Sequence, residues 1–300
     1  MRIVVALGGN ALLQRDERPD AMIQRRHVRQ AAAALAPLAA DHQLVLCHGN
    51  GPQVGVLALE SQADTSLSQP YPLDVLVAQT QGMIGYWLVQ EFGNAGVARR
   101  VACVVSQTVV DPSDPAFGHP TKFIGTSYGQ DEAQALATRR GWTVAADGPR
   151  WRRVVASPRP QGLAEIDTVR SLVDAGVLVV CGGGGGVPVV RSDNGELTGV
   201  EAVVDKDLTA AELAIALQAD RLLVLTDVPA VIRGYGTPDA QPIQAIDSAA
   251  LSAMTFPAGS MGPKVEACIR FVTATGQPAA IGALGDAAGI VAGRAGTTIR

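Results

Sequence analysis

Lysine is scarce in this chain. Lysine and arginine together number 24, and only Lys122, Lys206 and Lys264 are lysines. A protein that relies on arginine for nearly all its positive charge keeps lysine where a compact, flexible ammonium group is needed. Each of the three lysines stands beside a turn in the sequence. They are therefore the first candidates for a functional site.

Other features that would assign a function are also missing. The four cysteines are far apart and form no C-x-x-C pair, which disfavours zinc and redox sites. No uncharged apolar stretch reaches about 18 residues, and the N-terminus lacks the apolar core of a signal peptide. A net charge of -4 gives no general basic surface for nucleic acid. We expect a cytoplasmic protein with reduced thiols, and with neither a membrane nor a nucleic acid as partner.

Familiar nucleotide signatures are absent as well. No G-x-x-x-x-G-K-[ST] loop occurs near the main glycine run, and Val187 prevents that run from forming G-x-G-x-x-G. A dinucleotide-dependent dehydrogenase is thereby disfavoured. No Ser, His and Asp set for nucleophilic catalysis and no metal-ligand cluster stands out, so no protein ligand for a metal is assigned.

What the chain does have is a repeated order of apolar run, glycine turn and helix. Its 300 residues, 47% of them hydrophobic and 17% charged, can bury a large core. Strands are expected at residues 2–7, 44–47, 101–105, 177–181, 222–225 and 279–281, with helical patterns between them. This alternation predicts an α/β fold, with an open, mostly parallel sheet and helices on both faces.

Three of the expected strands run into glycine turns. Glycine accepts positive φ and lets consecutive backbone N–H groups face an anion. A proline near the start of a helix places the second turn at the positive end of that helix, where anions bind. Each turn, taken alone, is equally compatible with a plain tight turn. The three turns are Gly8-Gly9-Asn10, Asn50-Gly51-Pro52 and Gly182-Gly183-Gly184-Gly185-Gly186.

The segment around Lys122 is rich in turn residues. Residues 111–129 are expected to be irregular and to form a mobile lid or a small subdomain, because such a long loop with aromatic residues is rarely filler. The apolar runs on either side of Asp147-Gly148 predict a hairpin.

Two helical patterns carry expectations about burial. Residues 74–91 are apolar nearly all round, which predicts full burial by the core or by a second subunit, and Gly82 and Gly85 would let another helix approach closely. Arg25, Arg26 and Arg29 belong to an earlier helix and are expected to be solvated.

Lys206 lies between Asp205 and Asp207 at the start of a helix. The pattern fits either a helix cap with a surface ion pair or a catalytic lysine held in position. Lys264 stands near another helix start, where anions are favoured. His48 is more typical of a structural histidine than of a general base.

Glycine turns and isolated lysines together suit phosphoryl transfer. That reaction needs backbone donors around the phosphates, positive charges for the transferring group, and Mg²⁺ on the nucleotide. Tyr235 and Met261, both in loops after late strands, could sandwich a purine or could pack in the core.

Eight blocks, in order over essentially the whole chain, carry a family resemblance. They are V-A-L-G-G-N-A-L (5–12), H-G-N-G-P-Q-V-G (48–55), Q-G-M-I-G-Y (81–86), D-P-A-F-G-H-P-T-K (114–122), W-R-R-V-V-A-S-P (151–158), the glycine run (182–186), G-V-E-A-V-V-D-K-D-L (199–208) and G-S-M-G-P-K-V-E-A (259–267). Together they resemble the carbamate kinases, a branch of the amino acid kinase superfamily. Eight such blocks are very improbable by chance.

The resemblance implies two lobes and a reaction. Residues 1–203 would form the lobe for carbamate and carbamoyl phosphate, with a lid at about residues 112–160, and residues 204–300 would bind the nucleotide. The reaction implied is reversible, from ATP and carbamate to ADP and carbamoyl phosphate. Mg²⁺ would be held mainly by the nucleotide phosphates, and the protein would be a homodimer.

The resemblance also implies roles for particular residues. Lys122, Lys206 and Asp205 would be catalytic, with Asp205 orienting Lys206. The phosphoryl group and the acceptor would be bound by Gly8, Gly9, Asn10, Asn50, Gly51, Gly182, Gly183 and Gly184. The nucleotide would be bound by Asp227, Tyr235, Met261 and Lys264.

Some local departures from the family pattern concern the lid. Phe123 stands where proline is expected, and Thr126-Ser127 where proline and an aromatic residue are usual. Two alternatives stay open. One is a kinase for another carboxylate on the same fold, and the other is a nucleotide-binding sensor without catalysis.

Overall fold

The centre of the molecule is an eight-stranded sheet. The computed structural model describes residues 1–14, 17–256 and 261–300. All neighbouring strands of this sheet are parallel except β16 and β17, which confirms the predicted α/β fold with a mostly parallel sheet. In order across the sheet the strands are β15 (Ala245–Ile246), β17 (Thr297–Ile299), β16 (Ala279–Ala283), β12 (Arg221–Thr226), β1 (Arg2–Leu7), β2 (Gln43–His48), β9 (Leu178–Val180) and β3 (Val101–Cys103).

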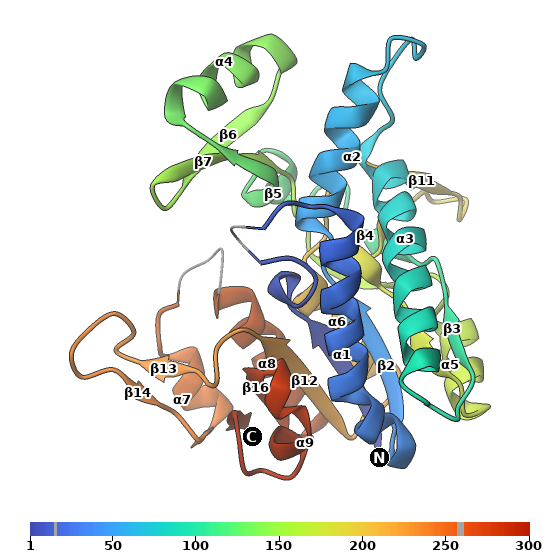
Figure 1. Cartoon of the computed structure of the whole chain (residues 1–300), viewed down its shortest axis with the longest axis vertical. Coiled ribbons are helices and arrows are strands. Elements are labelled where there is room, and N and C mark those ends of the chain that lie inside the picture. The colour runs from blue at the N-terminus through green and yellow to red at the C-terminus, as the bar shows by residue number, and fades with distance from the viewer. Residues whose placement is uncertain (15–16, 257–260) are drawn as a thin grey trace.

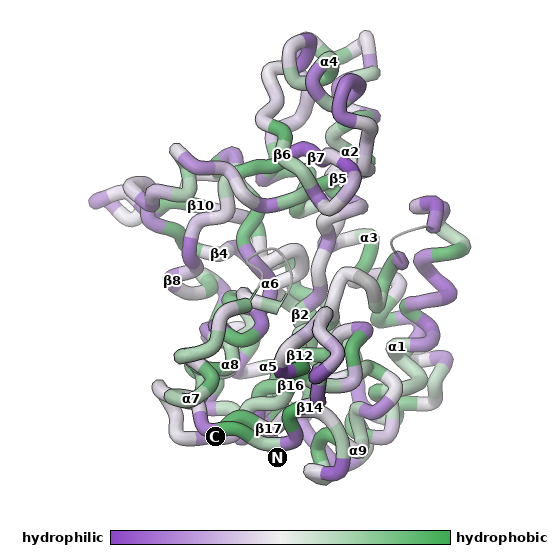
Figure 2. Tube along the Cα trace, turned by 90° about the vertical axis from the view of Figure 1, so that its left-hand side faces the viewer, coloured by the Kyte–Doolittle hydropathy of each residue, from purple (hydrophilic) through white to green (hydrophobic). Residues whose placement is uncertain are grey.

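The central strands are apolar because both faces of the sheet are covered. Side chains alternate between the two faces of a strand, so Ile3, Val5 and Leu7 join one core cluster while Val4 and Ala6 join the other. Strands buried on both faces read as continuous hydrophobic runs. Figure 2 shows this hydrophobic colouring along β12 and β16.

Helices form a layer on each face of the sheet, as predicted (Figure 1). One core cluster contains residues of α1 (Ala21–Asp41), α3 (Leu73–Asn94) and α9 (Ala287–Val291). The other contains residues of α5 (Ile166–Asp174), α6 (Lys206–Ala216), α7 (Ser248–Ser252) and α8 (Met261–Thr275). The short helices α7 and α9 were not predicted.

Beside the main sheet lies a second, four-stranded sheet that was not predicted. Its order is β11 (Leu197–Gly199), β10 (Val187–Arg191), β4 (Gln107–Val110) and β8 (Pro160–Leu163). Only β10 and β4 pair in parallel, and a register shift interrupts β4 at Val109 and Val110. These strands are short and interrupted by glycine and proline, so their periodicity is weak. A separate two-stranded ribbon, β13 (Ile232–Arg233) with β14 (Gln241–Pro242), was missed for the same reason.

Residues 122–155 form a small subdomain, which is called the lid below. It contains the antiparallel strands β5 (Lys122–Tyr128), β7 (Arg150–Val155) and β6 (Thr143–Asp147), and the helix α4 (Gln130–Arg140). The predicted hairpin is confirmed, since β6 and β7 pair around the turn after Asp147. The expected irregularity of residues 111–129 is wrong for β5, which pairs with β7.

The lid is carried by α2 (Gly51–Ala63) and stands at the end of the molecule away from both chain termini (Figures 1 and 2). Its residues lie inside the expected range of about 112–160. The main sheet runs without a break from β1 to β12, across the expected boundary between residues 203 and 204. The division into an acceptor lobe and a nucleotide lobe therefore stays a prediction.

Helix α3 is buried on one side only. Gln79, Gly82 and Tyr86 are exposed, so the core alone does not bury the helix fully. The close approach at Gly85 is made by a strand and not by a helix, because a Cβ at Gly85 would overlap the Cys103 side chain of β3. Within the described ranges, no helix has the length and apolar character needed to cross a membrane.

The arginines of α1 are partly exposed to solvent, as expected, and each is also paired with a carboxylate. Arg25 and Arg29 both donate to Glu91 of α3, at 3.0 and 3.2 Å. Arg26 pairs with Glu17. Glu91 is 1% exposed, and an ionised carboxylate at such a site needs partners to offset its lost hydration. The ion pairs therefore tie α1 to α3.

Replacing Glu91 with glutamine should remove a pH-dependent part of the stability. Burial alone would raise the pKa of Glu91, but hydrogen bonds from Arg25, Asn94 and Arg29 outweigh burial and lower the pKa from 4.5 to about 2. The carboxylate therefore stabilises the fold above about pH 4.5, and this contribution is lost as the pH falls towards 2. We expect Glu91→Gln to lower the free energy of unfolding by about 2 kcal/mol at pH 7.

Urea unfolding of both proteins at pH 7 and pH 3 measures this effect. The difference between wild type and Glu91→Gln should shrink at pH 3. The exposed Glu60 of α2 provides the control, because Glu60→Gln should leave the free energy of unfolding unchanged at both pH values. A Glu91→Gln difference that is the same at pH 3 as at pH 7 would contradict the prediction.

Candidate functional site

The three glycine turns meet at one edge of the main sheet. Gly8 follows β1, Gly49 follows β2, and Gly182 follows β9 after one residue. These strands are neighbours and parallel, so their carboxyl ends lie side by side. Strand β12, on the other side of β1, is joined to this edge by a hydrogen bond from the Gly8 N–H to the Leu225 carbonyl at 2.8 Å. In open α/β sheets this edge is where ligands bind.

The loop 182–186 is a buried turn that only glycine can form. Gly182, Gly184, Gly185 and Gly186 all have positive φ, and a Cβ at Gly185 would overlap the carbonyl of Val204. A backbone in this conformation strains any residue with a side chain. Gly183–Gly185 form a short 3-10 turn, η3, and Gly182 and Gly186 flank it.

Three hydroxyl groups hold this loop in place. Ser106 accepts a hydrogen bond from the Gly182 N–H at 2.7 Å. Thr108 and Thr209 both donate to the Gly185 carbonyl, at 2.7 and 2.8 Å. None of the three was predicted, because isolated serines and threonines carry no signal in one sequence. They make the glycine loop a fixed cradle.

The second turn starts α2 as predicted. Asn50 precedes the helix, Gly51 is its first residue and Pro52 its second. The Asn50 side chain does not cap the helix. It donates to the Thr80 hydroxyl of α3 at 2.9 Å and fills the space beside Gly184. The N-terminal N–H groups of α2 are thus presented at the same edge as the glycine cradle.

The first turn continues into the 3-10 helix η1 (Gly9–Ala11). Its backbone is described, and the side chain of Asn10 lies outside what the structure describes. The role expected for Asn10 therefore stays a prediction.

The Lys206 side chain packs against the turns at Gly9 and Gly49. Its Cδ atom would be 3.3 Å from a Cβ at Gly49, and the Gly9 Cα atom would be 3.6 Å from the same Cβ. Its Nζ atom donates to Asp207 Oδ1 at 2.7 Å. The lysine side chain is 9% exposed, so the pair is buried and not the surface pair that was one alternative.

Asp205 has two roles, and orienting Lys206 by contact is not one of them. Its Oδ1 atom accepts from the N–H groups of Asp207 and Leu208 and so caps α6, which agrees with the helix-cap part of the alternative whose surface ion pair is wrong. Its Oδ2 atom accepts from Lys122 of the lid. The contact with Lys206 that we expected from Asp205 is made by Asp207 instead.

Asp207 also belongs to the site, which the sequence did not predict. Its second oxygen accepts from Lys264 Nζ at 3.2 Å, so one carboxylate bonds two of the three lysines. Lys264 lies in the first turns of α8, which begins at Met261, and Gly259 and Ser260 before it lie outside the described residues. The D-K-D pattern at residues 205–207 was visible in the sequence, but the sequence did not show that the Asp207 carboxylate faces the site.

The pKa values reflect these contacts. Burial alone would raise the pKa of Asp205, but the charges of Lys122 and Lys206 outweigh it and hold the pKa well below its usual range. Burial alone would lower the pKa of Lys206, and the charges of Asp207 and Asp205 reverse this effect and raise it. Burial and the charge of Lys206 lower the pKa of Lys264. Near neutral pH, Asp205 is ionised and Lys206 is protonated.

The residues expected to bind the nucleotide are partly assembled. Asp227 directly follows β12 at the same edge, and Thr226 donates to it at 3.0 Å. Tyr235 is 76% exposed in the turn between β13 and β14. Met261 is half-buried and packs against a core cluster. The joint action of Tyr235 and Met261 on a base therefore stays a prediction.

His48 and Cys47 end β2 beneath the site. Burial lowers the pKa of His48 to about 4, so this imidazole is neutral at physiological pH, and its Nδ1 atom donates to the Gly49 carbonyl at 2.9 Å. Burial raises the pKa of Cys47 to about 12. These values make His48 a structural residue, in line with the sequence analysis, and make Cys47 an unreactive thiol.

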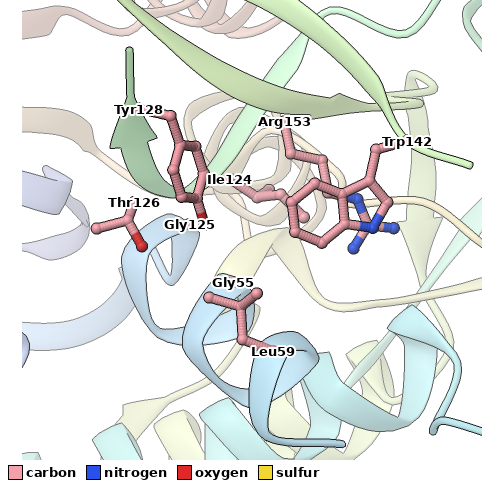
Figure 3. Close-up of a pocket in the computed structure, with 8 residues that line it drawn as sticks. All are labelled: Gly55, Leu59, Ile124, Gly125, Thr126, Tyr128, Trp142 and Arg153. Atoms are coloured by element: carbon pink, nitrogen blue, oxygen red, sulfur yellow. The ribbon is translucent and has the colours of Figure 1, made fainter. Parts of the chain in front are cut away.

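A small pocket lies between α2 and the lid, and no lysine lines it (Figure 3). It is lined by Gly55 and Leu59 of α2 and by lid residues that include Trp142 and Arg153. The pocket measures about 10 Å³, room for roughly one water molecule. It cannot hold a substrate and is a joint between two parts of the fold.

Comparisons with known proteins agree with this architecture. The profile of the Amino acid kinase family matches residues 1–283. The carbamate kinase of Rhizobium meliloti (strain 1021) is 49% identical over 302 residues, covering 100% of this chain and 93% of that protein. A structure of carbamate kinase from Giardia lamblia bound to citric acid has a TM-score of 0.94 and 39% identity, covering 99% of this chain and 97% of that one. A structure of carbamate kinase from Giardia lamblia bound to AMP-PNP has a TM-score of 0.89 and 41% identity, covering 99% and 98%.

The pairing at Asp207 can be tested by lysine NMR, because the chain has only three lysines. In Asp207→Asn, burial of Lys206 and Lys264 is no longer offset by the Asp207 charge, so the pKa of both should fall. Titration of a sample with ¹³C at lysine Cε measures all three values. Single lysine-to-arginine variants assign the signals.

Asp193→Asn, at an exposed turn, is the matched control and should leave the three titrations unchanged. If Asp207→Asn moved neither Lys206 nor Lys264, the ion pairs at Asp207 would not exist in solution.

Proposed function

Since the chain belongs to the amino acid kinase family, we propose that it transfers a phosphoryl group reversibly between ATP and carbamate, giving ADP and carbamoyl phosphate. Full-length relatives that are carbamate kinases, at up to 49% identity, support this acceptor. The observation that carries the proposal is the convergence of three glycine turns and all three lysines of the chain at one sheet edge. A kinase needs these parts, and they occur together here.

With carbamate as the acceptor, the proposed reaction needs no general base. Carbamate is already an anion, so its oxygen can attack the γ-phosphorus while the bond from that phosphorus to the ADP oxygen breaks. No proton must be removed from the nucleophile. His48, which is neutral and buried, need not act. Catalysis then rests on positioning and on neutralising charge.

The lysines would neutralise the transferring group from two sides. Lys122 reaches the site from the lid, while Lys206 lies along the glycine turns on the sheet side. Their carboxylate partners hold both ammonium groups in place before substrate binds. Arriving phosphate oxygens would share Lys122 with Asp205, so the pair serves as a preformed anchor for the closed lid.

Backbone donors would surround the same group. The Gly182, Gly185 and Gly186 N–H groups are bonded within the protein, and we propose that those of Gly183 and Gly184 face a phosphate. The first residues of α2 present further N–H groups. The remaining phosphate and acceptor contacts are proposed for Gly8, Gly9, Asn10 and Gly51, with Asn50 holding the turn.

The nucleotide would lie over the C-terminal part of the sheet edge. Asp227, Tyr235, Met261 and Lys264 are proposed to bind it. Lys122 pairs with Asp205, and Lys206 and Lys264 both pair with Asp207, so their ammonium groups are held where a phosphate chain would lie. Mg²⁺ would be held by the nucleotide phosphates and would neutralise part of their negative charge. No three acidic, histidine or cysteine side chains are grouped as metal ligands within residues 1–14, 17–256 and 261–300.

The reaction can be tested by ATP formation from ADP, Mg²⁺ and carbamoyl phosphate. We expect robust turnover by the wild type and a fall in kcat of about 100-fold or more in Lys122→Ala and in Lys206→Ala, since each removes a charge that stabilises the transition state. A reaction without enzyme corrects for spontaneous breakdown of carbamoyl phosphate.

Arg294→Ala is the control, because it removes an exposed positive charge after α9, far from the glycine turns, and should retain full activity. Near-normal turnover in both lysine variants would refute their roles. A folded wild type that binds ADP without turnover on carbamoyl phosphate or other acyl phosphates would point to the sensor. Turnover on another acyl phosphate alone would point to a different carboxylate acceptor.

We also propose that the protein is a homodimer in the cytoplasm. The exposed stripe of α3 contains Gln79, Gly82 and Tyr86 at helical spacing, and Tyr86 is 55% exposed. No atom lies within 4 Å of a Cβ at Gly82, which leaves room for another helix. Exposed tyrosine on an otherwise apolar helix is typical of an interface. The four free cysteines suit a reducing compartment.

Sedimentation at micromolar concentration measures the assembly. We expect about twice the mass of one chain for the wild type, and one chain for Tyr86→Arg, because a charge would be desolvated on both sides of a two-fold interface. Met22→Arg, at an 86% exposed position of α1, is the control and should remain a dimer. A monomeric wild type would exclude this interface.

A further inference from the structure

The lid is attached along one face of α2. The positions Gly51, Gly55, Leu59 and Gln62 recur every three or four residues, so they share a face of this helix. Each faces the lid. A Cβ at Gly51 would be 3.5 Å from the Phe123 carbonyl, Leu59 lines the pocket in Figure 3, and Gln62 accepts from Arg140 of α4 at 2.9 Å.

The tightest contact on this face joins two glycines. A Cβ at Gly55 would overlap the N and Cα atoms of Gly125 in β5 and would lie 3.2 Å from the Ile124 carbonyl carbon. The backbone of the strand therefore rests directly on the backbone of the helix. Gly55 is buried although it has no side chain. Any side chain here must push β5 away from α2, because backbone atoms cannot rotate aside.

Side chains around the two glycines make the joint firm. Ile124 is 1% exposed and packs in one cluster with Val54 and Ala58 of α2. The Arg153 guanidinium lies over the Trp142 ring at 5.0 Å, and both residues line the pocket above Gly55 and Leu59 (Figure 3). With room for roughly one water molecule, the pocket leaves the lid little freedom to settle closer to α2.

The joint lies next to the lid lysine in the same strand. Gly125 and Lys122 are both in β5, about 10 Å apart in an extended strand. A displacement of β5 at Gly125 is therefore passed on to Lys122, whose ammonium group reaches Asp205 across the site. The N-terminus of α2 carries Gly51, so the same helix sets the lid and the phosphate turn.

We propose that Gly55 is a positioning residue for Lys122. Because Gly55 has no side chain, β5 can pack directly on α2, and this packing fixes the distance of Lys122 from the edge of the main sheet. This inference rests on the proposed function only in that Lys122 acts on the transferring group. Gly55 itself touches no substrate and acts through the strand.

Gly55→Ala tests the proposal with a single methyl group. Alanine favours a helix more than glycine does, so α2 itself is not weakened. A lysine displaced by about 1 Å is expected to lower kcat for ATP formation from carbamoyl phosphate by about 100-fold. ADP binding, measured by calorimetry, should be unchanged. Gly93→Ala in α3 is the matched control, because a Cβ there meets nothing within 4 Å, and it should keep full activity.

A double-mutant cycle separates positioning of Lys122 from general damage. If Gly55 acts through the lysine, Gly55→Ala should cause no further loss in a Lys122→Ala background. The same 100-fold loss in both backgrounds, or full activity of Gly55→Ala alone, would overturn the proposal. Wild-type turnover that does not depend on Lys122 would instead refute the proposed function of the lysine.

Ile124→Ala approaches the same joint from the lid and serves if Gly55→Ala does not fold. It loosens the packing of β5 on α2 without adding atoms, and it should also lower kcat with no further loss in the Lys122→Ala background. Independent effects of Ile124→Ala and Lys122→Ala would overturn the proposal as well.

Discussion

The structure depends on a balance of charge at the N-terminus of α6. Burying an ammonium group is costly unless a carboxylate and further hydrogen bonds replace its water. Asp207 does this for Lys206 and Lys264, while Asp205 binds Lys122 and caps the helix at the same time. The helix start, the lid and α8 are thus joined by two adjacent carboxylates. Since each lysine pairs with a carboxylate of the same chain, the site is assembled without substrate.

The carboxyl-terminal edge of the main sheet determines where these charged groups and the glycine turns come together. Parallel strands bring their carboxyl ends to one line, so turns that are far apart in sequence become neighbours. Glycine is needed there because the turns touch one another. Lys206 lies over Gly49, and the Asn50 amide fills the space at Gly184. Larger residues would push the turns apart, so the backbone N–H groups would lie farther from the lysine ammonium groups. The glycine content of these loops is therefore a packing requirement of the whole site.

The sequence predicted the parts whose signal is local and missed those made by long-range pairing. Long apolar runs placed the central strands and helices, and glycine with proline placed the three turns. The second sheet escaped because strands such as β10 and β11 are stabilised by their neighbours and not by periodicity. Arg25 and Arg29 looked like solvated charges because their partner Glu91 lies about 60 residues away. The resemblance assigned Asp205 to Lys206, and only the fold showed that Asp207 bonds Lys206 while Asp205 bonds Lys122.

The unusual residues of the lid can now be weighed against its attachment to α2. Phe123 contributes its carbonyl to the contact with Gly51, which any residue could supply, and its ring lies 5.6 Å from the Arg152 guanidinium on the lid itself. Thr126 and Ser127 follow Gly125, on the far side of the joint from Lys122, where the register of β5 and β7 is already irregular. Between Gly125 and Lys122 the strand contains one residue that departs from the family pattern, Phe123, and its contact with α2 uses only the backbone carbonyl. In this lid of altered sequence, Lys122 reaches Asp205 across the site.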